Sequence, residues 1–107
     1  MKKNWQARQG DVFLRRIASV PTGAKPEERK GDVILALGEV TGHAHRIKAS
    51  LADVDVLREA EKIILNVKET VEVSHEEHGT ITLAPGLYES YVQREYDDIA
   101  EERRVLD

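Results

Sequence analysis

Residues 54–67, VDVLREAEKIILNV, hold two short apolar runs separated by charged residues. Residues 54–57 and 63–67 contain many β-branched side chains and have the length of strands, so we expect a hairpin with its turn at 59–61. A short helix over residues 50–62 is the competing interpretation, because some apolar residues there also follow helical spacing. The richness in strand formers favours two paired strands.

Further short strands are expected on both sides of this hairpin. Residues 11–17 and 70–73 combine strand formers with polar alternation, and 33–37, VILAL, form a continuous apolar run that we expect to be buried on both faces. Residues 80–83 and 87–96 complete the pattern. Prolines and glycines lie between these segments and interrupt regular structure. Short strands at such regular intervals predict an all-β fold, a small β-barrel or sandwich.

Length and composition predict one globular domain. The chain has 107 residues, of which 40% are hydrophobic and 34% charged. We expect a single β-barrel domain over residues 1–107, with the charged residues 97–107 as a C-terminal tail. No apolar run approaches the roughly 18 residues that cross a membrane. The basic start lacks the apolar stretch of a signal peptide, which predicts a cytoplasmic location.

All four histidines fall into two clusters, His43-Ala44-His45 and His75-Glu76-Glu77-His78. Imidazole is a common ligand for transition metals, so two close pairs predict a metal site. On a strand, His43 and His45 would point to the same face and share one ion. His75 and His78 would converge only in a turn or bulge. If the strand is regular there, a glutamate oxygen from Glu76 or Glu77 would replace one of them.

The predicted ligands are His43 and His45 together with one or both of His75 and His78, with at least one position open to water or substrate. The chain contains no cysteine, so nitrogen and oxygen must hold the ion. Zinc, iron, nickel and copper all suit imidazole, and the sequence predicts one divalent transition metal without choosing among them. Two alternatives stay open: a metal-free, hydrogen-bonded or proton-transferring histidine cluster, and a solvated surface loop.

The motifs around these histidines resemble a family of small bacterial proteins of unassigned function. They are Gly38-Glu39-Val40-Thr41-Gly42-His43-Ala44-His45, His75-Glu76-Glu77-His78-Gly79, Pro85-Gly86-Leu87-Tyr88 and Gln93-Arg94-Glu95-Tyr96. The similarity covers residues 10–96 and implies a bacterial protein without implying an activity.

A second resemblance is to the cupin superfamily of small metal-binding β-barrels. It rests on Gly38 followed by His43-Ala44-His45, and on Gly79 followed by Pro85-Gly86. The resemblance implies a cupin-like barrel with a bound metal. The glutamate that cupins carry soon after the histidine pair has no counterpart in residues 46–50, and the late cupin histidine is also absent.

The site predicts a small metalloenzyme that acts on a small polar or anionic substrate, with Glu77, Arg94 and Tyr96 as candidate substrate-binding residues. In the alternative interpretation, Tyr88 and Tyr96 pack at the edge of a sheet and Arg94 is a surface arginine. Trp5 is expected to plug the barrel. The metal would act as a Lewis acid or activate water or dioxygen.

A non-enzymatic module that responds to a metal or a small-molecule ligand is the alternative, and exposed strand edges would allow a homodimer. Metal-independent nucleic-acid binding or cleavage is disfavoured by the net charge of −4. Its support is a group of basic residues near the N-terminus: Lys2, Lys3, Arg8, Arg15 and Arg16.

Overall fold

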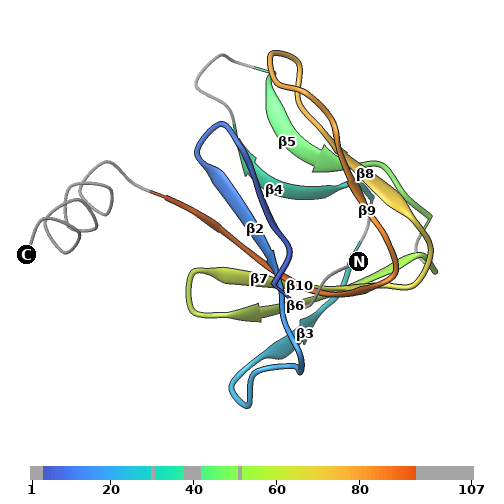
Figure 1. Ribbon diagram of the computed structural model, residues 1–107. Helices are drawn as coiled ribbons and strands as arrows, with labels where there is room; N and C mark the ends of the chain where they lie inside the picture. Colours follow the sequence, from blue (N-terminus) through green and yellow to red (C-terminus); the bar gives the residue numbers. More distant parts are fainter. Residues whose placement is uncertain (1–3, 30, 38–41, 51, 94–107) are drawn as a thin grey trace, which may run out of the picture.

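The computed structural model describes residues 4–29, 31–37, 42–50 and 52–93, and these form ten β-strands in two antiparallel sheets (Figure 1). The larger sheet has the order β1 (Gln6–Gln9), β2 (Val12–Arg16), β10 (Gly86–Val92), β7 (Lys62–Val67), β6 (Val54–Glu59) and β3 (Lys25–Glu27). The smaller sheet has the order β4 (Val33–Leu37), β5 (Ala44–Ile47), β8 (Val71–Ser74) and β9 (Ile81–Leu83).

The hairpin predicted at residues 54–67 is present as β6 and β7. Their register runs from Val54 opposite Val67 to Glu59 opposite Lys62, which leaves Ala60 and Glu61 as the turn. Ala60 has a positive φ of 51°, as the tight turns of hairpins require. The alternative of a helix over residues 50–62 is therefore wrong, because cross-strand pairing uses the backbone groups that a helix would have bonded internally.

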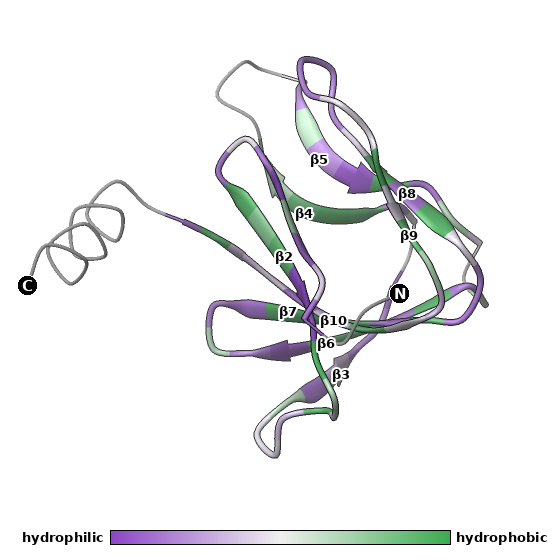
Figure 2. Cartoon of the chain, viewed as in Figure 1, coloured by the Kyte–Doolittle hydropathy of each residue, from purple (hydrophilic) through white to green (hydrophobic). Residues whose placement is uncertain are grey.

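One hydrophobic core is drawn from both sheets. Figure 2 shows hydrophobic residues along the strands and hydrophilic ones at many strand ends and turns. The larger sheet contributes Val12, Leu14, Val54, Val56, Ile63, Leu65, Val67 and Tyr88, and the smaller contributes Val33, Leu35, Ile47, Val71, Val73 and Leu83. The all-β prediction is confirmed in the form of two antiparallel sheets. The described strands do not join into one closed barrel.

Strand β4 is less buried than its apolar sequence predicts. Val33 and Leu35 face the core, but Ile34 is 38% exposed and Leu37 is 80% exposed. The expectation of burial on both faces is wrong because β4 is an edge of the smaller sheet and only one of its faces is covered. A register shift between Ile34 and Ala36 marks a bulge in its pairing with β5. Gly38, which the cupin resemblance uses, lies outside the described residues.

Strand β10 lies in the interior of the larger sheet, between β2 and β7, so the expected edge packing of Tyr88 is wrong. Tyr96 lies outside the described residues. Tyr88 is fully buried, its hydroxyl donates to the Ala84 carbonyl over 2.6 Å, and its ring packs edge-on against Trp5 at 5.5 Å. Trp5 thus packs against the core as expected. On the other face, Tyr91 contacts Phe13.

Two predictions about the C-terminal part of the chain fall on residues that the structure does not describe. The expected tail, 97–107, and the end of the expected strand 87–96 lie outside the described residues. The part of the chain that the structure describes contains no helix with the length and apolar character needed to cross a membrane.

Candidate metal centre

The register of the smaller sheet places the two histidine clusters opposite each other. Strands β5 and β8 pair Ile47 with Val73 and Arg46 with Ser74. Continuing this antiparallel register by one residue sets His45 opposite His75, and two residues further it sets His43 opposite Glu77. Because β8 ends at Ser74, the residues that follow form a turn-like segment above β5. The segment His75–His78 therefore bends and does not continue as a regular strand, which is the alternative in which both histidines can converge.

All four imidazoles gather at this place. Ring centroids are 4.2 Å apart for His45 and His75, 4.8 Å for His75 and His78, 5.8 Å for His43 and His75, and 5.9 Å for His45 and His78. His75 is therefore central, because it contacts each of the other three rings. The structure brings together all four residues that the sequence marked as candidate ligands.

One group of possible ligand atoms is close enough together to hold an ion, and it differs from the predicted set. One atom each from His43, His75 and Glu76 lie within 4.8 Å of one another. Glu76, which the sequence offered only as a substitute oxygen ligand, thus belongs to this group. His45 and His78 lie beside this group. Among the described residues, His43 Nδ1 is buried without a hydrogen bond, and its contact with Glu77 Oε1 is 3.5 Å.

The carboxylate of Glu76 is held from two sides. Its Oε2 accepts from the Ala44 backbone N–H over 3.1 Å, and its Oε1 lies 3.5 Å from Nη2 of Arg46. The pKa of Glu76 lies below its usual value because its own backbone N–H and that of Ala44 donate to it, and His43 and Arg46 lie nearby. Burial acts in the opposite direction without overcoming these contacts. Glu76 is thus a carboxylate, the form that a cation requires.

His45 has a fixed tautomer. The side-chain nitrogen of Gln9 donates to the carbonyls of Val73 and Gly79 over 3.0 and 2.8 Å. Its oxygen must therefore face His45 Nδ1, which lies 2.8 Å away and donates to it. The proton of the neutral ring is on Nδ1, and Nε2 carries a free lone pair.

Burial explains why His45 stays neutral. The residue is 2% exposed, and burial, followed by the neighbouring His75, lowers its pKa from the usual 6.5. Asp11 acts in the opposite direction through an oxygen 3.7 Å from Nε2. A histidine oriented by a hydrogen bond at one nitrogen, with the other nitrogen unprotonated, is the usual arrangement of a metal ligand or a general base.

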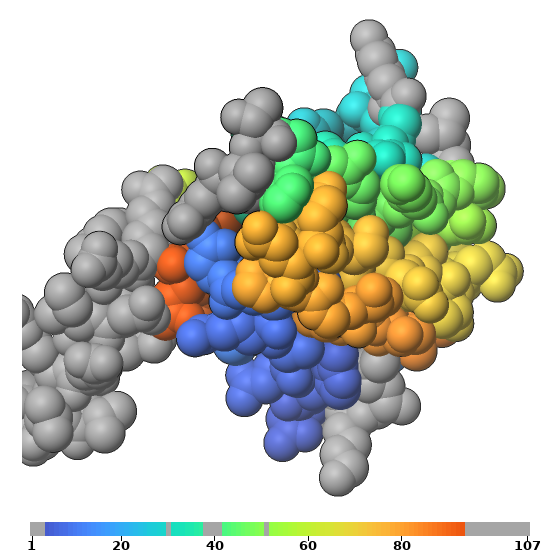
Figure 3. All heavy atoms as spheres, turned by 90° about the horizontal axis from the view of Figure 1, so that it is seen from above, coloured from blue at the N-terminus to red at the C-terminus, as the bar shows by residue number. Residues whose placement is uncertain are grey.

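The β1–β2 turn forms one wall of the cluster, as seen from above in Figure 3, where the gold segment after β8 lies against the blue hairpin and the green start of β5. Gly10 has φ +60°, and a Cβ built there would lie 2.8 Å from Nε2 of His78. Sequence reasoning missed Gln9, Gly10 and Asp11 as site residues. Nothing in the local sequence of this turn links it to the histidines.

The predicted substrate-binding residues have different outcomes. Glu77 lies beside His43, and its backbone N–H donates to Nδ1 of His75 over 3.0 Å. Arg94 and Tyr96 lie outside the described residues.

A hollow of about 250 Å³ adjoins the cluster on the outer face of the smaller sheet. It is lined by Ala44, Arg46, Lys48, Ser74, His75 and Glu76. His75 and Glu76 therefore belong both to the candidate ligand group and to this hollow, so a molecule in the hollow would lie next to a bound ion.

Comparison with known proteins identifies a family. No curated protein and no solved structure matches the chain. A family profile described as a domain of unknown function (DUF8820) matches residues 8–93. The matched range includes both histidine clusters and the β1–β2 turn that packs against them. The chain therefore belongs to the DUF8820 family.

Proposed function

We propose that this protein binds one divalent transition metal through His43, His75 and Glu76, and uses it on a small polar or anionic substrate. The observation that carries the proposal is the closeness of the three ligand atoms, within 4.8 Å of one another. Nδ1 of His43 supports it, because this nitrogen is buried and forms no hydrogen bond, with Glu77 Oε1 3.5 Å away. A buried nitrogen without a hydrogen bond calls for an explanation such as an ion.

The donor set fits such an ion with small movements. Ligand atoms on a tetrahedral ion at about 2.0–2.1 Å are roughly 3.4 Å apart. From spacings of at most 4.8 Å, each pair of ligand atoms therefore needs to approach by no more than about 1.4 Å. Side-chain rotation in the turn that carries His75 and Glu76 can supply this movement. Zinc, iron, nickel and copper all accept this mixture of imidazole and carboxylate.

Three protein ligands leave at least one position for solvent or substrate. When bound, the ion would supply Lewis-acid polarisation of a substrate oxygen or lower the pKa of a water molecule. His45, neutral and held by Gln9, either completes the ligand set or accepts a proton at Nε2. Glu77 lies beside His43 and is available to orient substrate. The cupin resemblance belongs to this proposal, with the histidine pair at a β-strand and further ligands from a neighbouring segment.

A metal-responsive binding module is the second candidate, and one contact favours it. His75 Nδ1 accepts a hydrogen bond from the Glu77 backbone N–H. If Nδ1 binds the ion, its lone pair is used. If Nε2 binds, the proton of the neutral ring moves to Nδ1. Either way this bond is lost, so binding would change the segment after β8 and give a partner something to recognise.

Nucleic acid is not part of the proposal. Arg15 forms an ion pair with Glu89, and the guanidinium groups of Arg8 and Arg16 lie 5.9 and 5.7 Å from the ring centroids of Phe13 and Tyr88. Each of these three basic side chains thus has a partner within the protein, and Lys2 and Lys3 lie outside the described residues. A bacterial cytoplasmic protein remains the expectation drawn from the sequence.

Elemental mass spectrometry of the purified chain, after dialysis against each of the four metals, tests the proposal. We expect about one ion per chain. His43→Ala, His75→Ala and Glu76→Gln should each lower the metal content, whereas Glu72→Gln should not, because Glu72 is an exposed carboxylate on β8 itself. Circular dichroism confirms that each variant folds. A folded wild-type protein that retains none of the four metals would overturn the proposal.

Turnover separates the two candidates. A metal-dependent reaction on a small anionic or polar compound, lost in His45→Asn while metal content is retained, would favour the enzyme. Metal binding that shifts the segment after β8 without any turnover would favour the binding module.

A further inference from the structure

We propose that the hollow on the outer face of the smaller sheet binds an oxyanion group, a carboxylate or a tetrahedral anion, of a small molecule. The hollow has a volume of about 250 Å³, enough for such a group with part of its parent molecule. Binding of the anion is independent of any metal. Its coupling to a metal, argued below, rests on the proposed function.

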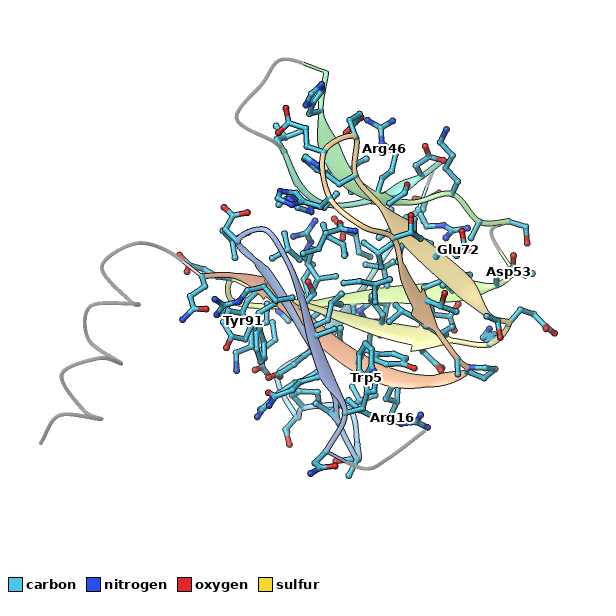
Figure 4. All side chains as sticks on the ribbon, turned by 45° about the horizontal axis from the view of Figure 1, so that its top comes forward. Trp5, Arg16, Arg46, Asp53, Glu72 and Tyr91 are labelled. Carbon is cyan, nitrogen blue, oxygen red and sulfur yellow. The ribbon has the colours of Figure 1, made fainter. Side chains whose placement is uncertain are left out.

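The alternation of side chains along the strands brings the hydrogen-bond donors that line the hollow to the same face of the sheet. Arg46 follows Ala44 by two residues on β5 and Lys48 follows Arg46 by two, so all three side chains point away from the core that His45 and Ile47 face. Ser74 is the cross-strand partner of Arg46. A guanidinium, an ammonium and a hydroxyl group thus converge on one place, with Arg46 visible on the smaller sheet in Figure 4.

The guanidinium of Arg46 is only loosely held. Its Nη2 lies 3.4 Å from the Gly42 carbonyl and 3.5 Å from Glu76 Oε1, and its Nη1 lies 4.0 Å from Asp32. Charge-assisted hydrogen bonds to carboxylates are shorter, about 2.7–2.9 Å. A planar, bidentate anion would therefore make better bonds with Arg46 than its present neighbours do.

Lys48 adds a second positive charge. It is exposed and forms no ion pair with any residue that the structure describes. The acids that compete for these cations are Glu76 and Asp32, together with Glu72 on the neighbouring strand β8. Of the side chains that line the hollow, two are cations and one is an anion, which favours an anionic ligand.

Glu76 connects the hollow with the candidate metal centre. One of its oxygens lies near Arg46, and one of its oxygens belongs to the three-atom ligand group. A cation at that group would offset the charge of Glu76 and loosen its hold on Arg46. The anion would then meet less repulsion and a freer guanidinium. Metal and anion should therefore bind with positive coupling, which is reciprocal by thermodynamic necessity.

NMR titration of the full chain with sodium sulfate and with sodium acetate tests the site, in protein stripped of metal by a chelator. We expect saturable shifts of the Arg46, Lys48, Ser74 and His75 amides. Sulfate binding alone would indicate a tetrahedral anion, and acetate binding alone a carboxylate. Arg46→Gln should weaken binding about tenfold or more, and Lys48→Gln severalfold, as expected for losing a charged hydrogen bond.

Two further variants sharpen the result. Lys25→Gln, which removes an exposed lysine from β3 of the other sheet, should leave the affinity unchanged. Glu76→Gln should strengthen anion binding in metal-free protein, because it removes the competing charge. Shifts that do not saturate, or equal losses in Lys25→Gln and Lys48→Gln, would overturn the site and indicate general ionic attraction only.

Repeating the titration with zinc separates the two proposals. If sulfate or acetate binds here while zinc does not bind at all, the anion site stands and the proposed metal function fails. If zinc binds and neither anion does, the anion site is overturned. Binding of both with unchanged affinities overturns the coupling through Glu76.

Discussion

Gln9 and His45 are joined by a buried hydrogen bond of 2.8 Å, in which the imidazole Nδ1 donates to the glutamine oxygen. The glutamine amide also donates to the backbone carbonyls of Val73 on β8 and of Gly79, which follows the histidine segment. A single side chain of β1 therefore holds both of these backbone positions and orients His45. Replacing it disturbs the larger sheet, the smaller sheet and the candidate site together.

Gln9→Ala should lower the free energy of unfolding by about 1–3 kcal/mol, because it leaves buried polar groups without partners. Gln6→Ala, on the exposed side of the same strand, should change it by less than about 0.5 kcal/mol. Urea denaturation of both variants measures the difference. Equal effects would mean that the hydrogen bonds of Gln9 contribute nothing beyond the strand itself.

Stability should fall as the pH decreases below 6.5. The pKa of His45 is lowered in the folded protein, so the unfolded chain takes up its proton first, at about the usual value of 6.5. The contribution is therefore present above pH 6.5 and is lost as the pH falls through the folded pKa. Glu76, also with a lowered pKa, adds a separate loss that begins below its usual value of 4.5.

Urea unfolding at several pH values between 5 and 8 checks this dependence. His45→Asn should flatten it, because the asparagine amide can still donate to Gln9 but does not titrate. His78→Asn, at an exposed ring of the same cluster, serves as the comparison. A slope that survives in His45→Asn would assign the effect to another group.

Metal binding should shift the Glu77 amide resonance more than those of the sheet interior. The backbone N–H of Glu77 donates to His75 Nδ1, and coordination through either nitrogen of this neutral ring removes that acceptor. A ¹H–¹⁵N spectrum recorded with and without zinc measures the shift. An unchanged Glu77 amide in zinc-loaded protein would exclude His75 as a ligand.

Gly10→Ala should be more disruptive than Gly42→Ala. Both glycines have a positive φ, +60° and +88°, so alanine adds about 1–2 kcal/mol of backbone strain at each. At Gly10 the new methyl group also meets Nε2 of His78, whereas at Gly42 nothing lies within 4 Å. Gly10→Ala should therefore lose more stability than Gly42→Ala, and it alone should shift the NMR signals of the His78 ring protons. Thermal unfolding and NMR measure both effects.

Strand β4 should mediate weak self-association. It is an edge of the smaller sheet and exposes Ile34 and Leu37, and such edges pair readily with a second chain. Sedimentation velocity at increasing concentration should show a dimer that Leu37→Lys weakens. Val20→Lys, at a half-exposed valine between β2 and β3, should have no effect. A strictly monomeric wild-type chain would contradict this prediction.

The sequence predicted which segments form strands better than it predicted how deeply each strand is buried or which strands are neighbours. The strands at 54–57 and 63–67 followed from local composition, because β-branched runs and a short turn are local properties. The burial of residues 33–37 did not, since the exposure of Ile34 and Leu37 depends on β4 being an edge strand. Strand order is set by long-range pairing, which no local pattern encodes.

The candidate site was predictable in part for the same reason. Histidine pairs at close spacing marked four members of the cluster, and the turn at His75–His78 explained how both rings converge. Gln9 and Asp11 were invisible because they come from a hairpin far away in the sequence and carry no metal-site motif. Glu76 belongs to the candidate ligand group because its carboxylate accepts a hydrogen bond from the Ala44 backbone on the neighbouring segment, a long-range contact that the local sequence does not reveal.

The two histidine segments come together only when the chain folds. Their side chains approach only when β5 and β8 pair, and the link from Gln9 to the residues after β8 spans 70 positions in the sequence. A peptide that contains only one of the two segments would have two imidazoles, but it would lack the other segment and the β1–β2 turn that pack around them. Proximity of the four rings is thus a signature of completed folding. A variant that keeps its strands but separates these rings has lost the close approach of the segment after β8 to the start of β5.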